Sequence, residues 1–131
     1  MKKILIVDDH AEIRLLLRMT LARDYEIIEA NDGWSALELV RSQHPDMVLL
    51  DILMPGRING LQVLHAIKFD PVINHTIVAL VTSLGTYPDC QLGSQWGADA
   101  YFIKPFSPAN IVSWLKDVFT YRNDLKNELP I

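Results

Sequence analysis

Ile4-Leu5-Ile6-Val7-Asp8-Asp9 is a short apolar run that ends in two adjacent carboxylates. The same arrangement recurs at Met47-Val48-Leu49-Leu50, which is followed by Asp51. Uninterrupted apolar runs of this length are typical of strands that are covered by helices on both faces. These two stretches therefore predict buried strands that carry acidic groups at their carboxyl ends.

Two further apolar runs end in side chains that suit contact with a phosphate. Residues 77–81 are followed by Thr82 and Ser83, and residues 101–103 are followed by Lys104. A hydroxyl donates a hydrogen bond to a phosphate oxygen, and a lysine supplies a compact positive charge. If all four runs are parallel strands of one sheet, their polar ends lie along one edge, where open α/β sheets bind ligands.

Apolar runs alternate with helical segments along the chain, which predicts a doubly wound α/β fold, (βα)5, with a parallel sheet and right-handed crossovers. The expected strands are residues 3–7, 25–29, 46–50, 77–81 and 99–103. The expected helices lie near 10–22, from 31 onward, near 60–68, near 87–96 and from 107 onward.

Local signals mark several of these helices. Asp32 and Ser107 stand where a side chain is expected to cap a helix N-terminus. Gly93 weakens the helix near 87–96, because glycine is a poor helix former. In the first helix, the leucine spacing places Leu16 on the face that should be buried.

The composition fits a single soluble domain in the cytoplasm. A length of 131 residues suits one domain with a core, and 50% hydrophobic residues argue against disorder. The net charge of -4 gives no basic surface, so direct binding to nucleic acid is not expected. No apolar stretch is long enough to span a membrane, and the single Cys90 fits a reducing compartment. We expect the domain to cover residues 1–121, with a tail or the start of a linker over 122–131.

The clustered carboxylates favour a bound cation. Asp8, Asp9 and Asp51 would repel one another at one sheet edge, and their proton affinity would rise unless something neutralised them. Mg²⁺ meets this need, since it prefers oxygen ligands and binds through one or two carboxylates and a phosphate, and Mn²⁺ also suits carboxylates. An aspartate carboxylate can in addition form a covalent phosphoryl intermediate.

Several stretches of the chain resemble receiver domains of the two-component response regulators, in particular those like the chemotaxis regulators. They are Ile4–Asp9, Ala30-Asn31-Asp32-Gly33, Ala36-Leu37, Asp51-Ile52-Leu53-Met54-Pro55, Thr82-Ser83 and Gly97–Phe106. Their order and spacing match the family over nearly the whole chain. The resemblance implies a flavodoxin-like fold whose five-stranded parallel sheet has the order 2-1-3-4-5, with helices on both faces.

The resemblance also implies how the acidic residues act. Asp51 would accept a phosphoryl group. Asp9 would bind Mg²⁺ directly and Asp8 mainly through water. Asp51 itself and the main-chain carbonyl of Leu53 would complete the metal ligands.

A second set of roles concerns the phosphoryl group and the switch. Thr82, with Ser83 beside it, and Lys104 would hold the phosphoryl oxygens. Tyr101 would change rotamer as Thr82 moves toward the phosphate, which would alter the surface of the fourth helix, fifth strand and fifth helix. The peptide bond before Pro105 would be cis.

The same resemblance implies the partners. The phosphoryl donor would be a histidine kinase or a histidine phosphotransfer protein, and the signal would pass to a downstream output protein or domain. The surface of the fourth helix, fifth strand and fifth helix could also form a homodimer. Neither nucleic acid nor a membrane is expected as a direct partner. The domain would be a signalling switch, and an enzyme only in its own phosphorylation and hydrolytic reset.

Two features depart from the family pattern or stand outside it. The loop after Met54-Pro55 is one residue longer, at 56–60, and we expect Arg57 to place an extra cation near the mouth of the site. The four histidines show no metal-binding spacing, and only His10 lies close enough to the site to affect it.

Two other functions are alternatives. A docking module with a receiver fold would bind partners without phosphorylation, although the complete set of acids, hydroxyl and lysine argues against it. A metal-dependent phosphatase with an aspartate nucleophile usually carries a second acid two residues further on. Leu53 occupies that position here, which disfavours turnover of small substrates.

Overall fold

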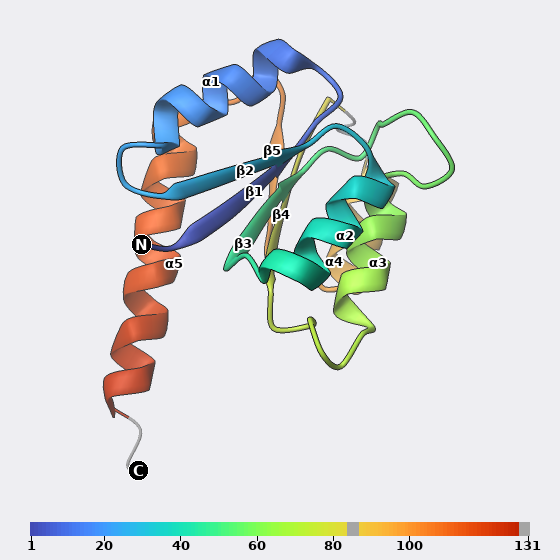
Figure 1. Cartoon of the computed structure of the whole chain (residues 1–131). Coiled ribbons are helices and arrows are strands. Elements are labelled where there is room, and N and C mark those ends of the chain that lie inside the picture. Colours follow the sequence, from blue (N-terminus) through green and yellow to red (C-terminus); the bar gives the residue numbers. More distant parts are fainter. Residues whose placement is uncertain (84–86, 129–131) are drawn as a thin grey trace.

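The computed structural model is a five-stranded parallel sheet with the strand order β2-β1-β3-β4-β5, which confirms the predicted topology (Figure 1). The strands are β1 (Lys3–Val7), β2 (Glu26–Ala30), β3 (Met47–Leu50), β4 (Ile77–Thr82) and β5 (Ala100–Ile103). The structure describes residues 1–83 and 87–128, with side chains described for 1–83 and 91–121.

Helices cover both faces of this sheet, as the sequence pattern requires. On one face lie α1 (Ala11–Leu21) and α5 (Pro108–Glu128) (Figure 1). On the other lie α2 (Gly33–Gln43), α3 (Gly60–Lys68) and α4 (Tyr87–Gln95). Among the described residues, no helix combines the length and apolar character needed to cross a membrane.

Each face of the sheet has its own apolar core, and the interior strand β1 contributes to both. Ile4 and Ile6 pack with the side chains of α1 and α5, whereas Leu5 and Val7 pack with those of α2 and α3. Successive side chains of a strand point to opposite faces, so a strand covered on both sides must be apolar at every position. This is the physical reason for the uninterrupted apolar run that begins the chain.

Side-chain caps hold several helix ends where the sequence predicts them. Asp32 accepts a hydrogen bond from the Ser35 main-chain nitrogen at 2.8 Å, and Ser107 accepts one from the Asn110 nitrogen at 3.3 Å. Because such caps satisfy main-chain donors that the helix leaves unpaired, they fix where each helix begins.

Two details differ from the sequence-based expectations. Leu16, which we expected to be buried, is 42% exposed, because α1 directs Leu17 and Leu21 to the sheet and leaves Leu16 toward solvent. Residues 122–128 continue α5 as helix, where we expected a tail or linker, and 129–131 lie outside the described residues. The domain boundary at residue 121 stays a prediction.

The turn from β3 into α3 is unusually close-packed. The Gly60 main-chain nitrogen donates to the Ile52 carbonyl oxygen at 2.9 Å. A Cβ atom at Gly60 would overlap the Asp51 carbonyl oxygen and would lie 2.6 Å from the Ile52 Cα. Only glycine lets the start of α3 rest against the strand end that carries Asp51.

We therefore expect Gly60→Ala to lower the free energy of unfolding by about 2–3 kcal/mol, as overpacking does in a tight core. At an ordinary helical position the same exchange stabilises a protein by about 1 kcal/mol. Gly56→Ala is the control, since its Cβ meets nothing within 4 Å and only the positive φ of 104° opposes it. Chemical denaturation measures both variants, and a Gly60→Ala protein as stable as the wild type would contradict the close packing.

Candidate functional site

Three strand ends bring opposite charges together at the carboxyl edge of the sheet. Asp8 follows β1, Asp51 follows β3 and Lys104 follows β5. The Lys104 Nζ atom lies 2.7 Å from Asp8 Oδ2 and 3.3 Å from Asp51 Oδ2. Both carboxylate side chains are only 3% exposed. We call Asp8, Asp9 and Asp51 the acidic site.

The proton affinities at this edge reflect burial competing with charge. Burial raises the pKa of Asp51 above its ordinary value, and the nearby Asp8 raises it further. The charge of Lys104 and a hydrogen bond from Thr82 oppose the shift without cancelling it. For Lys104, burial favours a lower pKa, but the hydrogen bond to Asp8 and the charge of Asp51 outweigh it, so its pKa is raised. Lys104 therefore stays charged, but its charge only partly offsets the effect of burial on the Asp51 carboxylate.

The β1–α1 turn is held by a second set of polar contacts. The main-chain nitrogen of His10 donates to Asp8 Oδ1 at 2.8 Å. Arg14 Nη1 donates to the Asp8 carbonyl oxygen at 2.7 Å, and its Nε lies 3.3 Å from Glu29 Oε1 on β2. The sequence reasoning missed this role of Arg14. The available signal was the four-residue spacing of Arg14 and Arg18, which puts both guanidinium groups on one helix side, facing Glu29.

The acidic site fits a divalent cation. One possible ligand atom from each of Asp8, Asp9, His10 and Asp51 lies within 4.8 Å of the others. Asp9 Oδ1 is buried and accepts no hydrogen bond within the described residues, although His10 Nδ1 lies 3.2 Å from it. A buried acceptor without a donor costs free energy, and a hard cation with oxygen ligands would satisfy it. His10 is exposed at the N-cap position of α1, close to the acidic site as the sequence predicted.

The other predicted site residues lie in β5 or shortly after the ends of β3, β4 and β5. The Leu53 main-chain nitrogen donates to Asp51 Oδ1 at 3.2 Å, and its side chain is exposed. Ser83 is exposed just beyond β4, and Tyr101 is half-buried against the core on the α2–α3 side. The Lys104–Pro105 peptide bond is cis, as the family resemblance implied. A metal-binding role for the Leu53 carbonyl stays a prediction.

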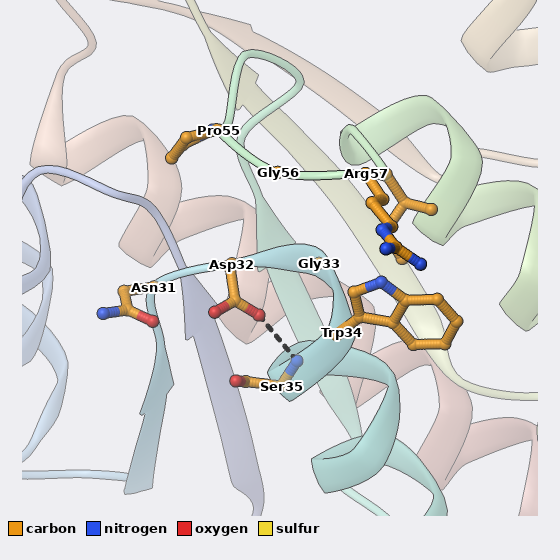
Figure 2. Close-up of a pocket in the computed structure, with 9 residues that line it drawn as sticks. Asn31, Asp32, Gly33, Trp34, Ser35, Pro55, Gly56 and Arg57 are labelled. Atoms are coloured by element: carbon orange, nitrogen blue, oxygen red, sulfur yellow. Dashed lines mark hydrogen bonds between the residues drawn. The ribbon is translucent and has the colours of Figure 1, made fainter.

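The longer loop packs against the start of α2. Residues 55–58 and the start of α2 line an open groove of about 640 Å³. Figure 2 shows the Arg57 side chain beside the Trp34 ring, and no ion pair joins it to another described residue. Ile58 packs closely on Gly33 at the start of α2, since a Cβ at Gly33 would lie 2.5 Å from Ile58 Cγ1. An extra cation from Arg57 near the mouth of the site stays a prediction.

The site combines the elements needed for phosphoryl chemistry. It has a buried carboxylate as a nucleophile, further carboxylates for a metal ion, and a lysine and a hydroxyl to contact phosphoryl oxygens. Phosphoryl transfer depends mainly on positioning and charge neutralisation, which such a constellation supplies. Position 53 holds a leucine, where a phosphatase with an aspartate nucleophile usually carries its second acid.

Comparison with known proteins gives a consistent result. The family described as the response regulator receiver domain matches residues 4–116. The probable transcriptional regulator ycf27 of Guillardia theta is 37% identical over 93% of this chain and 47% of its own length. The phosphate regulon transcriptional regulatory protein PhoB of Pseudomonas aeruginosa is 34% identical over 99% of this chain and 57% of its own length. The chain thus spans about half the length of these curated relatives.

A solved structure agrees with these relatives. The chemotaxis protein CheY4 of Vibrio cholerae superposes with a TM-score of 0.82 and is 29% identical in sequence. The superposition covers 90% of this chain and 98% of that one. The match therefore extends across nearly the whole of both chains.

The raised pKa of Asp51 predicts how stability depends on pH. In the metal-free protein, stability should fall as pH rises from the unfolded-state aspartate pKa of about 3.9 through the higher folded-state value. Asp51→Asn avoids this loss, so we expect it to be more stable than the wild type by about 1 kcal/mol at neutral pH, but not below about pH 3.9.

Urea denaturation in the presence of a chelator measures this difference at both pH values. The exposed Asp117 provides the control, because Asp117→Asn should leave stability nearly unchanged. A variant Asp51→Asn that is less stable than the wild type at neutral pH would show instead that the attraction of Lys104 outweighs burial.

Proposed function

The chain belongs to the response regulator receiver domain family, and we propose that it is a switch that accepts a phosphoryl group on Asp51. The donor is a histidine kinase or a histidine phosphotransfer protein, and the reaction requires Mg²⁺ or Mn²⁺. The observation that carries the proposal is the buried Asp51 carboxylate, which lies 3.3 Å from Lys104 and receives a hydrogen bond from Thr82.

The transfer step follows from the chemistry of a carboxylate and a phosphohistidine. An Asp51 oxygen attacks the phosphorus, the phosphorus–nitrogen bond breaks, and the departing imidazole keeps the electron pair and is free to take up a proton. Asp8, Asp9, Asp51 and the Leu53 carbonyl would hold the metal ion. When bound, the ion neutralises charge that builds up on the phosphoryl oxygens.

Lys104 and Thr82 complete the phosphate contacts. Lys104 already contacts the nucleophile, so a short movement of its Nζ would carry it to a phosphoryl oxygen. Thr82 is fully buried at the end of β4, and Ser83 follows it at the surface. A hydroxyl at this place donates a hydrogen bond without adding charge. Together they would stabilise the aspartyl phosphate that the transfer creates.

The signal would leave the site through β4 and β5. Between β4 and β5, Thr82 is paired with Ile103 and Leu80 with Tyr101. A shift of the Thr82 backbone would therefore displace the paired residues of β5. A cavity of about 200 Å³ adjoins Tyr101, which leaves room beside its ring for a rotamer change. Phosphorylation would thus bias an existing equilibrium of the α4–β5–α5 surface.

We further propose that this surface passes the signal to an output protein or domain, or to a second copy of the chain, in the cytoplasm. The relatives named as transcriptional regulators are about twice as long, and their names suggest control of transcription as one output. The chain acts as a signalling domain, with catalysis limited to its own phosphorylation and reset. A phosphorylation-independent docking module is not favoured, because the acids, the hydroxyl and the lysine all meet at one edge.

Intact-protein mass spectrometry tests the proposal directly. We expect a phosphoryl-sized mass gain when the protein is incubated with Mg²⁺ and acetyl phosphate. The mass gain should be absent in Asp51→Asn, which lacks the nucleophilic carboxylate. It should also be absent without a divalent ion, because no metal then neutralises the charge of the phosphoryl oxygens. It should persist in Asp117→Asn, which removes an exposed carboxylate on α5.

Two results would contradict the proposal. One is the absence of any mass gain from acetyl phosphate or from a phosphorylated histidine phosphotransfer protein. The other is a gain that persists in Asp51→Asn, which would place the phosphoryl group elsewhere. Either result would leave the fold unaffected, and the first would favour the docking module.

A further inference from the structure

The imidazole of His10 is directed at the acidic site although most of its ring is exposed. Its Nδ1 lies 3.2 Å from Asp8 Oδ1 and 3.2 Å from Asp9 Oδ1, and the side chain is 61% exposed. The main-chain nitrogen of His10 also donates to Asp8 Oδ1, which fixes the residue at the start of α1. One imidazole nitrogen thus lies between two carboxylates of the acidic site.

The ligand atoms are close enough to share one ion. The atoms offered by Asp8, Asp9, His10 and Asp51 all lie within 4.8 Å of one another. Bonds from a divalent ion to oxygen or nitrogen are about 2.0–2.2 Å, so two ligands of one ion lie up to about 4.4 Å apart. A closure of a few tenths of an ångström would therefore bring the imidazole into the same coordination shell as the carboxylates.

The imidazole matters because metal ions differ in their affinity for nitrogen. Mg²⁺ is a hard ion that takes oxygen ligands and keeps several waters, so it gains little from a histidine. Imidazole suits Zn²⁺, Cu²⁺, Ni²⁺ and iron, and affinity rises from Mn²⁺ through Co²⁺ and Ni²⁺ to Cu²⁺. An ion of this group would gain the imidazole as a further protein ligand, whereas Mg²⁺ would leave the nitrogen uncoordinated.

We propose that His10 Nδ1 is a ligand that selects for borderline transition-metal ions, such as Co²⁺ and Zn²⁺, at this site. The inference rests on the metal-binding part of the proposed function. It assigns to the site a second class of ion, chosen by a nitrogen donor. Occupancy would then depend on which divalent ions are available as well as on Mg²⁺.

Titration of the metal-free full chain with Co²⁺ alone tests this, with visible absorption reporting nitrogen ligation. His10→Phe keeps an aromatic ring but removes both nitrogens, and we expect it to bind Co²⁺ at least about tenfold more weakly than the wild type. Its affinity for Mg²⁺, measured by calorimetry, should stay within about twofold. His65→Phe is the matched control, because His65 lies on α3, away from the acidic site, with its ring centroid 4.2 Å from that of Phe69. This substitution should leave both affinities unchanged.

Equal Co²⁺ affinity in the wild type and His10→Phe would overturn the inference while leaving Mg²⁺ binding and Asp51 phosphorylation intact. Failure of the wild type to bind either ion would overturn both the inference and the metal requirement of the proposed function. A measurement on the wild type avoids any folding defect of the variant. On addition of Zn²⁺, the ¹⁵N resonance of His10 Nδ1 should shift strongly, and an unmoved resonance would also overturn the inference.

Discussion

Two carboxylates from different strands share one buried lysine, and the rest of the site depends on that contact. Lys104 lies 2.7 Å from Asp8 and 3.3 Å from Asp51, with both carboxylates almost inaccessible to water. Removing Lys104 would leave two buried carboxylates without a compensating charge, which is strongly destabilising. The arrangement persists because the parallel register aligns the ends of β1, β3 and β5. Two apolar cores supply the stability that this polar edge lacks.

The carboxylate charge at this edge of the sheet is only partly neutralised by other groups of the described chain. Lys104 lies between two buried carboxylates, and the buried Asp9 Oδ1 accepts no hydrogen bond within the described residues. A divalent cation would relieve both conditions at once, so metal binding would have the same physical origin as the raised pKa of Asp51. Supporting contacts keep the acids in place, notably that of Arg14 with the Asp8 carbonyl oxygen. The residues at this edge of the sheet therefore depend on one another, and the effects of single substitutions there on stability should not be additive.

The sequence predicts the sheet and most of the acidic site because strand ends are readable from it. A strand buried on both faces must be apolar throughout, so the position where Ile4–Val7 gives way to Asp8 marks the edge of the sheet. What the sequence does not encode locally is the direction of side chains across elements. Leu16 is an example, since α1 directs Leu17 and Leu21 to the sheet and leaves Leu16 exposed. The contact of Arg14 with Glu29 likewise depends on how α1 lies over β2.

The central claim is that phosphorylation of Asp51 changes the distant α4–β5–α5 surface. Nuclear magnetic resonance with beryllofluoride tests this claim most directly, because beryllofluoride mimics a phosphoryl group on an aspartate oxygen. With Mg²⁺ present, we predict large amide shifts at Asp9, Asp51 and Thr82 that continue through Tyr101 into α4 and α5. Asp51→Asn should show none of them. Shifts that stop at the acidic site, or that appear equally without a divalent ion, would contradict the switch.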